Sequence, residues 1–334
     1  MWTTLGPLGA GRPVNSRCDS FDTLYNNCMT VGSVLPTAPT RPRVLSYGGG
    51  LDSFAALVEA IRRGEAPDVV AFVDVSDPAH EDPGEWEGTY RHIEEVVRPL
   101  CAKHGIELVI ISSDKYPVRN ARSLFAWLAE RGQIPVAGPN RICTTVAKVE
   151  RFEAWARDRY GAVEVEVWIG FEAGEEQRAQ KDPNAGGKRA RKEGDIIRHN
   201  RFPLIEWQLC RCRCEALVRD AGYPVPRKSA CCFCPYASKG DWQTLARERP
   251  EVFQKIVKLE ASKPPTKKNG ITLSIMGFRT LKNPDGSVRG HKNPMLPVFI
   301  QGTYKAKVRP CAICGAPQRA SKATACGYLD DAAA

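Results

Sequence analysis

Cysteine thiols at metal-ligand spacing are the groups in this chain whose chemistry is easiest to name. Cys231 and Cys234 form a C-x-x-C pair, and two thiolates at that spacing can hold one metal ion or two irons of a cluster. Either site needs four ligands, and the candidates for the other two places are Cys143 and Cys214. Two further cysteines compete with Cys214 for its place: Cys210 and Cys212. Cysteines alone do not select the metal, so structural zinc and an iron–sulfur cluster both stay open.

A second C-x-x-C pair, Cys311 and Cys314, lies near the C-terminus and is followed by Cys326. Three thiols are one ligand short of a closed zinc site, and His291 could complete it. The pattern predicts zinc as the metal at this second site.

A glycine-rich turn is the other feature that could do chemistry. An apolar run ends at Ser46 and is followed by YGGGLDS, residues 47–53. Apolar residues then recur at helical spacing: Phe54, Leu57, Val58 and Ile61. Glycine amides and the positive end of a helix dipole can together bind a phosphate. Asp52 and Ser53 stand where a helix cap or a phosphate contact would be, and the simpler alternative is a tight turn.

The elements that must position these groups alternate along the chain. Apolar segments predict strands at residues 68–75, 106–112 and 162–171, and amphipathic segments predict helices at 85–104, 121–131 and 144–160. This alternation predicts an α/β fold with a doubly wound parallel sheet covered on both faces. Ligands then bind beyond the carboxyl ends of the strands, where the glycine turn lies. Short helices at 214–221, 240–249 and 250–261 predict a cysteine-rich helical C-terminal extension.

Composition sets the broad class and the expected domains. The 334 residues contain 13 cysteines, and without an apparent secretory signal this number favours metal or redox use in a reducing cytoplasm. No run of 18 apolar residues occurs, so we expect no membrane span. The expected parts are a flexible leader (1–40, with Met29 as an alternative start), a nucleotide-binding domain (41–208), a cysteine-rich segment that completes the metal site (209–262) and a basic tail (263–334).

Positive charge is concentrated in the basic tail. Between Ser262 and Pro310 there are ten Lys or Arg residues and one acid, Asp285, whereas the whole chain has a net charge of +10. This concentration favours a polyanion partner such as tRNA or DNA. A second basic run, between Lys181 and Arg201, predicts a loop without packed structure.

The glycine turn and the cysteines together resemble a known superfamily. Residues 49–53 match the pyrophosphate loop (PP-loop) S-G-G-x-D-S of the ATP pyrophosphatases and the phosphoadenosine-phosphosulfate (PAPS) reductases. Gly48 replaces the usual first Ser, and Leu51 stands where sulfonucleotide reductases carry Lys. An R-x-C at 141–143, PLIEW at 203–207 and S-x-C-x-x-C-P at 229–235 resemble a branch common in phages and bacterial mobile elements.

This resemblance implies an adenine nucleotide alpha hydrolase-like fold and a [4Fe-4S] cluster beside the nucleotide. The cluster ligands that it implies are Cys143, Cys214, Cys231 and Cys234. A further segment, residues 170–178, is similar to the family's G-x-R-x-D-E-x-x-R. Gly170, Glu175 and Arg178 match, whereas Glu172 replaces Arg and Gly174 replaces Asp. Both losses count against a doubly phosphorylated sulfonucleotide as the substrate.

The resemblance also implies roles for residues around the loop. The residues that would bind ATP (or PAPS) and Mg²⁺ are Ser46, Gly48, Gly49, Gly50, Asp52, Ser53, Asp74 and Gly170. The residues implied as catalytic are Asp52, Ser53 and Arg178. Several have simpler alternatives: Asp52 as a helix cap, Asp74 as the end of a strand and Arg178 as a surface residue. Arg141 and Lys148 would face phosphates or would be solvated helix charges.

Three functions follow as hypotheses. The first is adenylation-linked sulfur transfer or reduction, on a nucleic acid and with a sulfur donor or reductant protein. The second is a sulfonucleotide reductase that releases sulfite; its catalytic Cys lies in E-C-G-[LI]-H, which Cys326 in ACGYL matches only in part. The third is a metal-bearing nucleic-acid-binding protein with an inactive nucleotide site.

Overall fold

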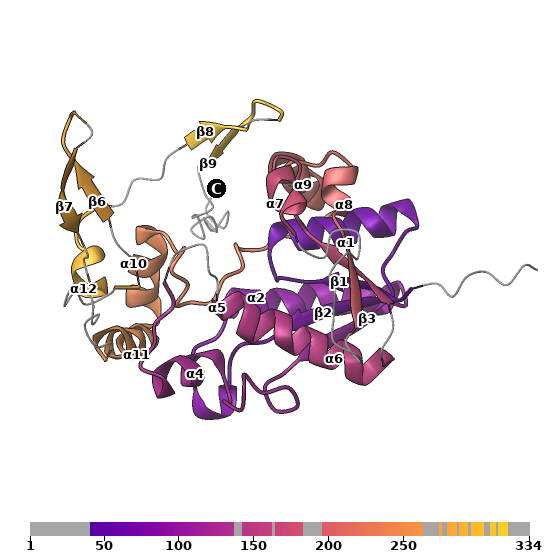
Figure 1. Cartoon of the computed structure of the whole chain (residues 1–334). Helices are drawn as coiled ribbons and strands as arrows, with labels where there is room; N and C mark the ends of the chain where they lie inside the picture. Colours follow the sequence, from indigo (N-terminus) through magenta and orange to yellow (C-terminus); the bar gives the residue numbers. More distant parts are fainter. Residues whose placement is uncertain are drawn as a thin grey trace, which may run out of the picture. The chain divides into compact units, whose positions relative to one another are not determined.

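Five parallel strands form the central sheet of the protein, for which we describe a computed structural model (Figure 1). The strands are β1 (Arg43–Ser46), β2 (Val69–Val73), β3 (Glu107–Ile111), β4 (Glu164–Ile169) and β5 (Ile197–Arg201). Their spatial order is β3-β2-β1-β4-β5. The chain therefore winds outward in one direction through β2 and β3 and in the other through β4 and β5. The predicted α/β class with a doubly wound parallel sheet is confirmed, with its switch point between β1 and β4.

The structure describes residues 41–136, 142–161, 164–182, 196–262, 274–275, 279–285, 287–292, 295–303, 308–311 and 313–319. The chain divides after Thr40, and Arg41–Ala334 are one unit, which is described by itself. The predicted leader (1–40), Met29, Arg141 and Cys326 lie outside the described residues. The other predicted domain boundaries stay predictions.

Helices cover both faces of the sheet because the strand residues alternate between two apolar cores. On one face, Leu45, Phe72 and Trp168 share a core with α1 (Leu51–Arg63) and α9 (Arg211–Asp220). Val44, Val69 and Val167 point the other way and pack with α6 (Glu150–Tyr160). This period of two along each buried strand separates the two layers of helices.

The helix predicted at 85–104 is divided into three parts. It consists of α2 (Glu87–His92), a π-helical turn (Ile93–Val97) and α3 (Arg98–Lys103). Pro99 lies in the first turn of α3 and donates no amide hydrogen bond, so a change in the hydrogen-bond ladder just before it is expected. The helix predicted at 144–160 likewise contains α5 (Ile142–Thr144), a π-helical turn (Thr145–Val149) and α6.

A third core joins segments that are distant in sequence. Trp127 of α4 (Leu124–Glu130) packs in one cluster with Trp242 of α10 (Lys239–Glu248) and Ile256 of α11 (Pro250–Ala261). The start of α10 is closed by a capping box, in which the Ser238 hydroxyl and the Asp241 carboxylate bind each other's backbone amides. The helices of the cysteine-rich segment thus divide between two cores, because α9 packs on α1 and α10 packs on α4.

The prediction of a loop between Lys181 and Arg201 is wrong for the last residues of this segment, which form the edge strand β5. The buried side chains of this strand are polar, and they have hydrogen-bond partners. Arg198 binds Glu153 at 3.1 Å, and Asn200 donates to Asp182 at 3.0 Å. Paired polar groups can be buried at a sheet edge, so hydrophobic patterning alone could not find this strand.

The remaining elements are short. Along the chain they are α7 (Glu176–Gln180), α8 (Pro203–Glu206), β6 (Arg279–Lys282), β7 (Val288–Lys292), α12 (Leu296–Phe299), β8 (Val308–Pro310) and β9 (Pro317–Arg319). The strands β6 and β7 form one antiparallel pair, and β8 and β9 form another. Among the helices of the described residues, none has the length and apolar character needed to cross a bilayer.

A buried carboxylate connects α11 to the segments that follow it. Glu260 is 0% exposed and accepts hydrogen bonds from the Ser274 hydroxyl (2.8 Å) and from the amides of Ile275 (2.9 Å) and Leu296 (2.7 Å). In Glu260→Gln the side-chain NH₂ would face one of these donors, so we expect a loss of about 2–4 kcal/mol in the free energy of unfolding. Urea unfolding measures it, with the exposed Glu251→Gln on the same helix as control. Equal midpoints for both variants would contradict a structural role for Glu260.

Candidate functional site

The glycine turn lies at the switch point of the sheet and leaves the start of α1 open. The Ser53 hydroxyl accepts a hydrogen bond from the Gly48 amide (3.2 Å) and donates one to the Gly50 carbonyl (3.1 Å), which closes the turn on itself. Gly50 is the N-cap of α1, and no side chain caps the helix. The first amides of a helix have no partner within it, so this end of α1 can bind an anion such as phosphate.

Two glycines in the site allow segments to approach too closely for any side chain. Gly49 has a φ of 76°, and a Cβ there would lie 2.4 Å from Thr89 Cγ2. A Cβ on Gly170 would lie 2.9 Å from the Ser53 amide nitrogen and 3.1 Å from the Asp52 carbonyl carbon. Gly170 follows β4 directly, so the end of β4 rests on the first turn of α1. The structure thus brings Gly170 to the loop residues, and its predicted role in nucleotide binding stays a prediction.

Asp52 lies in the first turn of α1 and is bound by an arginine from α9. Arg211 Nη1 lies 3.1 Å from Asp52 Oδ2 and 3.3 Å from Oδ1. The Arg211 amide also donates to the Glu172 carboxylate. Burial raises the pKa of Asp52, and the Arg211 charge opposes this rise. Because Gly50 occupies the cap, Asp52 is not the N-cap residue. Nothing in its sequence spacing marks Arg211, since only the packing of α9 on α1 brings it to the loop.

The other predicted site residues are placed differently. Arg178 forms an ion pair with Glu175 and lies over the Phe171 ring, 4.1 Å from its centroid. Asp74 accepts hydrogen bonds from Ser76 and from the Tyr90 hydroxyl (2.8 Å), as expected for a residue that ends a strand. Ser46 is exposed at the end of β1. Their proposed contacts with nucleotide stay predictions.

The carboxyl of Glu172 is poised to titrate near neutral pH. Burial and the neighbouring Asp52 carboxylate raise its pKa to about 7, with a smaller raising effect from Glu175, while the Arg211 amide and charge act in the opposite direction. Glu172 therefore gains negative charge as the pH rises from 6 to 8, and this charge would repel a polyphosphate placed at the start of α1.

We expect the affinity for ATP without divalent cations to fall about three- to tenfold between pH 6 and pH 8 for this reason. In Glu172→Gln the residue does not titrate, so its affinity should change much less. Fluorescence titration in EDTA measures the dissociation constants, and the exposed Glu87→Gln is the control. Parallel pH profiles for Glu172→Gln and the parent would contradict this role of Glu172.

Three of the four predicted cluster ligands, Cys143, Cys231 and Cys234, interact with one another, although their sulfur atoms are not all within 4.8 Å of one another, and Cys214 lies in a different core. Cys143 and Cys231 both pack against the core around α4 and α10. Burial raises the pKa of Cys234, and Cys143 adds to the rise; Cys234 in turn adds to the effect of burial on Cys231. Cys214 is buried in the other core, beside α1, with its thiol 3.9 Å from the Leu209 carbonyl.

A buried ion pair lies beside Cys231, one of these three thiols. Lys148 Nζ is 2.8 Å from Glu85 Oε1, and Cys231 Sγ is 3.8 Å from the same oxygen. The Glu85 side chain is 0% exposed. Burial alone lowers the pKa of Lys148, but Glu85 together with Cys231 and Cys234 outweighs burial, and the pKa of Lys148 is raised. The predicted alternatives for Lys148, a phosphate contact or a solvated charge, both differ from this arrangement, and no sequence signal identified Glu85.

Ser229 connects the cysteine segment to the glycine turn. Its hydroxyl donates to the Gly48 carbonyl, and a Cβ on Gly50 would lie 3.3 Å from Ser229 Cβ. This contact holds Ser229, which lies two positions before Cys231, next to the turn, although 181 positions separate it from Gly48 along the chain.

Asp74 also lines a cavity of about 1450 Å³. Its lining includes Tyr90, Trp86 and Cys232, and the Arg227 guanidinium lies over the Trp86 ring at 3.8 Å. The volume exceeds that of a typical small-ligand pocket, so the cavity can admit part of a larger molecule.

No protein-family model matches the chain, and comparison with curated proteins found no match either. Among solved structures, the PAPS reductase of Candida auris, in a phosphate complex, matches with a TM-score of 0.34 and 16% identity over 56% of this chain and 76% of that one. The U34-tRNA thiolase NcsA of Methanococcus maripaludis, with its [4Fe-4S] cluster, matches with a TM-score of 0.37 and 16% identity over 70% of this chain and 76% of that one.

The chain is similar to a PAPS reductase and to a thiolase with an iron–sulfur cluster. These are the kinds of protein that the sequence resemblance leads one to expect. Because both TM-scores are low, the two similarities carry no weight in the assignments that follow, which depend on the loop, the glycines and the thiols. The narrower phage and mobile-element branch stays a prediction.

Proposed function

We propose that the protein is a PP-loop enzyme that binds an adenine nucleotide, in the first instance ATP, and uses it for adenylation-linked sulfur transfer or reduction. The observation that carries this proposal is the uncapped start of α1 at the switch point, closed on one side by Gly170. A doubly wound sheet binds its ligands at this place. The neighbouring thiols connect the nucleotide site to sulfur chemistry.

The loop and its neighbours have distinct tasks in this proposal. Amides at the start of α1 and in the turn bind the phosphates and stabilise the charge of the departing pyrophosphate. Asp52 and Glu172 supply carboxylate oxygens, the ligands that Mg²⁺ prefers. Arg211 and Arg178 supply positive charge beside these carboxylates and orient the phosphates. An acceptor oxygen attacks the α-phosphate, and a sulfur nucleophile then displaces AMP.

The cysteine donor set fits an iron–sulfur cluster. Cys143, Cys231 and Cys234 supply three thiolates, and the Lys148 charge lies near Cys231 and Cys234, where it stabilises negative charge. A cluster held by these three residues would supply electrons or carry the sulfur. With Cys214 in the other core, we propose these three cysteines as the ligands and Cys214 as a core residue.

Metal analysis of the anaerobically purified chain tests the cluster. We expect about four irons per chain and a broad absorption band at about 400 nm, both lost in Cys234→Ala. The matched control is Cys232→Ala, a buried thiol between the proposed ligands. Stoichiometric zinc without iron at these cysteines would rule the cluster out.

Nucleotide turnover tests the reaction. We expect AMP and pyrophosphate from ATP with Mg²⁺, and a loss of about a hundredfold or more in Asp52→Asn. The matched control is Asp68→Asn, whose half-exposed carboxylate binds Arg43 away from the loop. Sulfite release from PAPS would favour a sulfonucleotide reductase instead, and neither activity would favour an inactive nucleic-acid-binding protein.

A nucleic acid, tRNA or DNA, is the proposed acceptor because of the basic tail. Neutralising Lys267, Lys268 and Lys292 to Gln is expected to weaken binding to duplex and to reduce the slope of log K against log salt by up to about 2.7, if all three contact phosphate. Three lysines elsewhere provide the control: Lys103, Lys115 and Lys258, each changed to Gln. The same slope in both triple variants would remove the basic tail from the interface.

A sulfur donor or reductant protein in the cytoplasm is the remaining proposed partner.

A further inference from the structure

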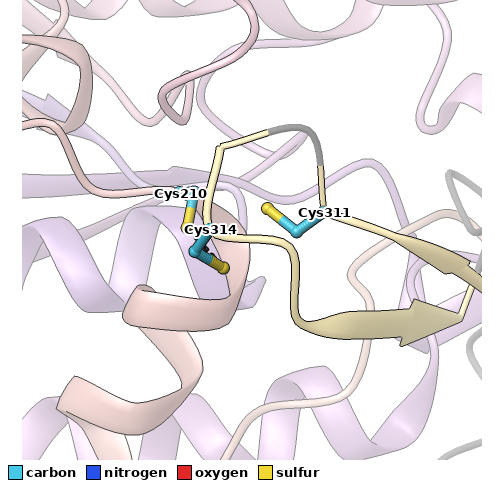
Figure 2. A group of neighbouring side chains, drawn as sticks. All are labelled: Cys210, Cys311 and Cys314. Carbon is cyan, nitrogen blue, oxygen red and sulfur yellow. Dashed lines mark hydrogen bonds between the residues drawn. The ribbon is translucent and has the colours of Figure 1, made fainter.

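Four cysteines from two distant parts of the chain meet beside the start of α9. Cys210 is the N-cap of α9 and Cys212 lies in its first turn, whereas Cys311 and Cys314 lie between β8 and β9. Figure 2 shows three of them, with the Cys311 sulfur directed toward Cys210 and Cys314. The sequence pattern did not indicate that Cys210 and Cys212 would lie at the same site as Cys311 and Cys314.

The spacing of the sulfur atoms fits a single metal ion. The Sγ atoms of Cys210, Cys311 and Cys314 all lie within 4.8 Å of one another, and Cys210 Sγ is 3.7 Å from Cys314 Sγ. Four thiolates around zinc, at a Zn–S distance of about 2.3 Å, place their sulfur atoms about 3.8 Å apart. Within the part of the chain that the structure describes, this is the one group of three or more potential ligands at such distances.

Cys212 supplies a fourth thiol. It packs against the small cluster of Ala173, Cys210 and Cys311. Its thiol also interacts with the thiols of Cys314 and Cys311. A metal ion bound by these four residues would hold them as thiolates that share one centre.

The turn between β8 and β9 is already shaped to present thiolates. The Gly315 amide donates to the Cys311 carbonyl (2.9 Å), and the Cys311 amide donates to the Ala316 carbonyl (2.8 Å). Gly315 has a φ of 72°, which glycine adopts without strain. The backbone amides of Cys314 and Ile313 also form hydrogen bonds with the Cys311 sulfur.

We propose that Cys210, Cys212, Cys311 and Cys314 bind one zinc ion as four thiolates. This site replaces the expected set of Cys311, Cys314, Cys326 and His291; Cys326 and the His291 side chain lie outside what the structure describes. The zinc fastens the turn between β8 and β9 to the start of α9. Arg211, which lies between two of the ligands, binds Asp52, so the same ion holds α9 in register with the glycine turn.

Zinc content and zinc coordination test the proposal without reference to activity. The full chain, produced with added zinc and purified under reducing conditions, is expected to contain one zinc that Cys314→Ser and Cys212→Ser both lose. Cys101→Ala, a buried thiol in the core beside α1, is the control that should keep it. Zinc X-ray absorption of the parent, which does not depend on the folding of a variant, should show four sulfur neighbours at about 2.3 Å.

Several results would overturn this site. These are a parent chain without zinc, zinc with a nitrogen or oxygen neighbour, full zinc content in Cys212→Ser, and a disulfide between Cys311 and Cys314 in the reduced, metal-supplemented protein. Iron analysis of the same samples separates the site from the proposed cluster, since Cys234→Ala should lose iron and keep zinc. The zinc site can therefore fail while the proposed function stands, and the reverse.

Discussion

Replacing Gly170 with Ala is expected to reduce nucleotide binding by about a hundredfold or more. The added Cβ would lie 2.9 Å from the Ser53 nitrogen and 3.1 Å from the Asp52 carbon and from Ser53 Cα. All three are backbone atoms, so no side-chain rotation relieves the contact, and α1 must move away from β4. Losing one or two hydrogen bonds between the proposed phosphate-binding amides and a charged phosphate, worth about 1.5–3 kcal/mol each, is sufficient for a loss of this size. Equilibrium binding of a fluorescent ATP analogue measures it.

The matched control for this prediction is Gly88→Ala. Gly88 lies in α2, and a Cβ there would have no atom within 4 Å, so this variant should bind as the parent does. Circular dichroism and thermal unfolding of both variants show whether Gly170→Ala keeps the sheet intact. A folded Gly170→Ala with unchanged affinity would place the nucleotide away from α1 and would remove the main support for the proposed function.

Removing the Lys148 charge is expected to have a large effect on stability. In Lys148→Met the Glu85 carboxylate, which is 0% exposed, loses the ammonium group that compensates it, and the Cys231 thiol lies 3.8 Å away. An unpaired buried charge costs about 3–5 kcal/mol. Because the Lys148 side chain is itself 35% exposed, water reduces this cost, and we expect a loss of about 2–4 kcal/mol in the free energy of unfolding.

A double-mutant cycle separates the ion pair from simple packing. Glu85→Gln combined with Lys148→Met removes both charges, so the double variant should recover much of the stability lost in Lys148→Met, with a coupling energy of about 1–3 kcal/mol. Urea unfolding of the apo proteins measures all four corners of the cycle. Additive losses would show that the two side chains do not stabilise each other and that Lys148 acts through its packing alone.

The α/β class could be predicted because buried parallel strands have a strong signature. Segments such as VVAFV in β2 are apolar throughout, since helices cover both faces of the sheet. The edge strand β5 lacked this signature because its buried side chains, Arg198 and Asn200, are polar and paired with Glu153 and Asp182. Their partners come from other elements, so no pattern within the strand marks them.

The arrangement around the glycine turn, where we propose the nucleotide binds, could be predicted in part. The loop residues and Gly170 followed from local motifs, because a turn that binds phosphate constrains consecutive residues. Arg211 could not be found in this way, since it reaches Asp52 from 159 positions away. The ion pair of Lys148 could not be predicted either, because the position of Lys148 on a helix does not indicate that the distant Glu85 is buried against it.

The sequence by itself determined the fold class, the position of the glycine turn at the start of the first long helix, and the presence of two C-x-x-C pairs. These features depend on residue types at short spacing, which a chain carries before it folds. The tertiary structure alone decided which distant thiols come together. It placed Cys214 in the core beside α1, and it brought Cys210 to Cys314 across 104 positions. Metal sites close through such long-range contacts, because their ligands must converge in space rather than along the chain.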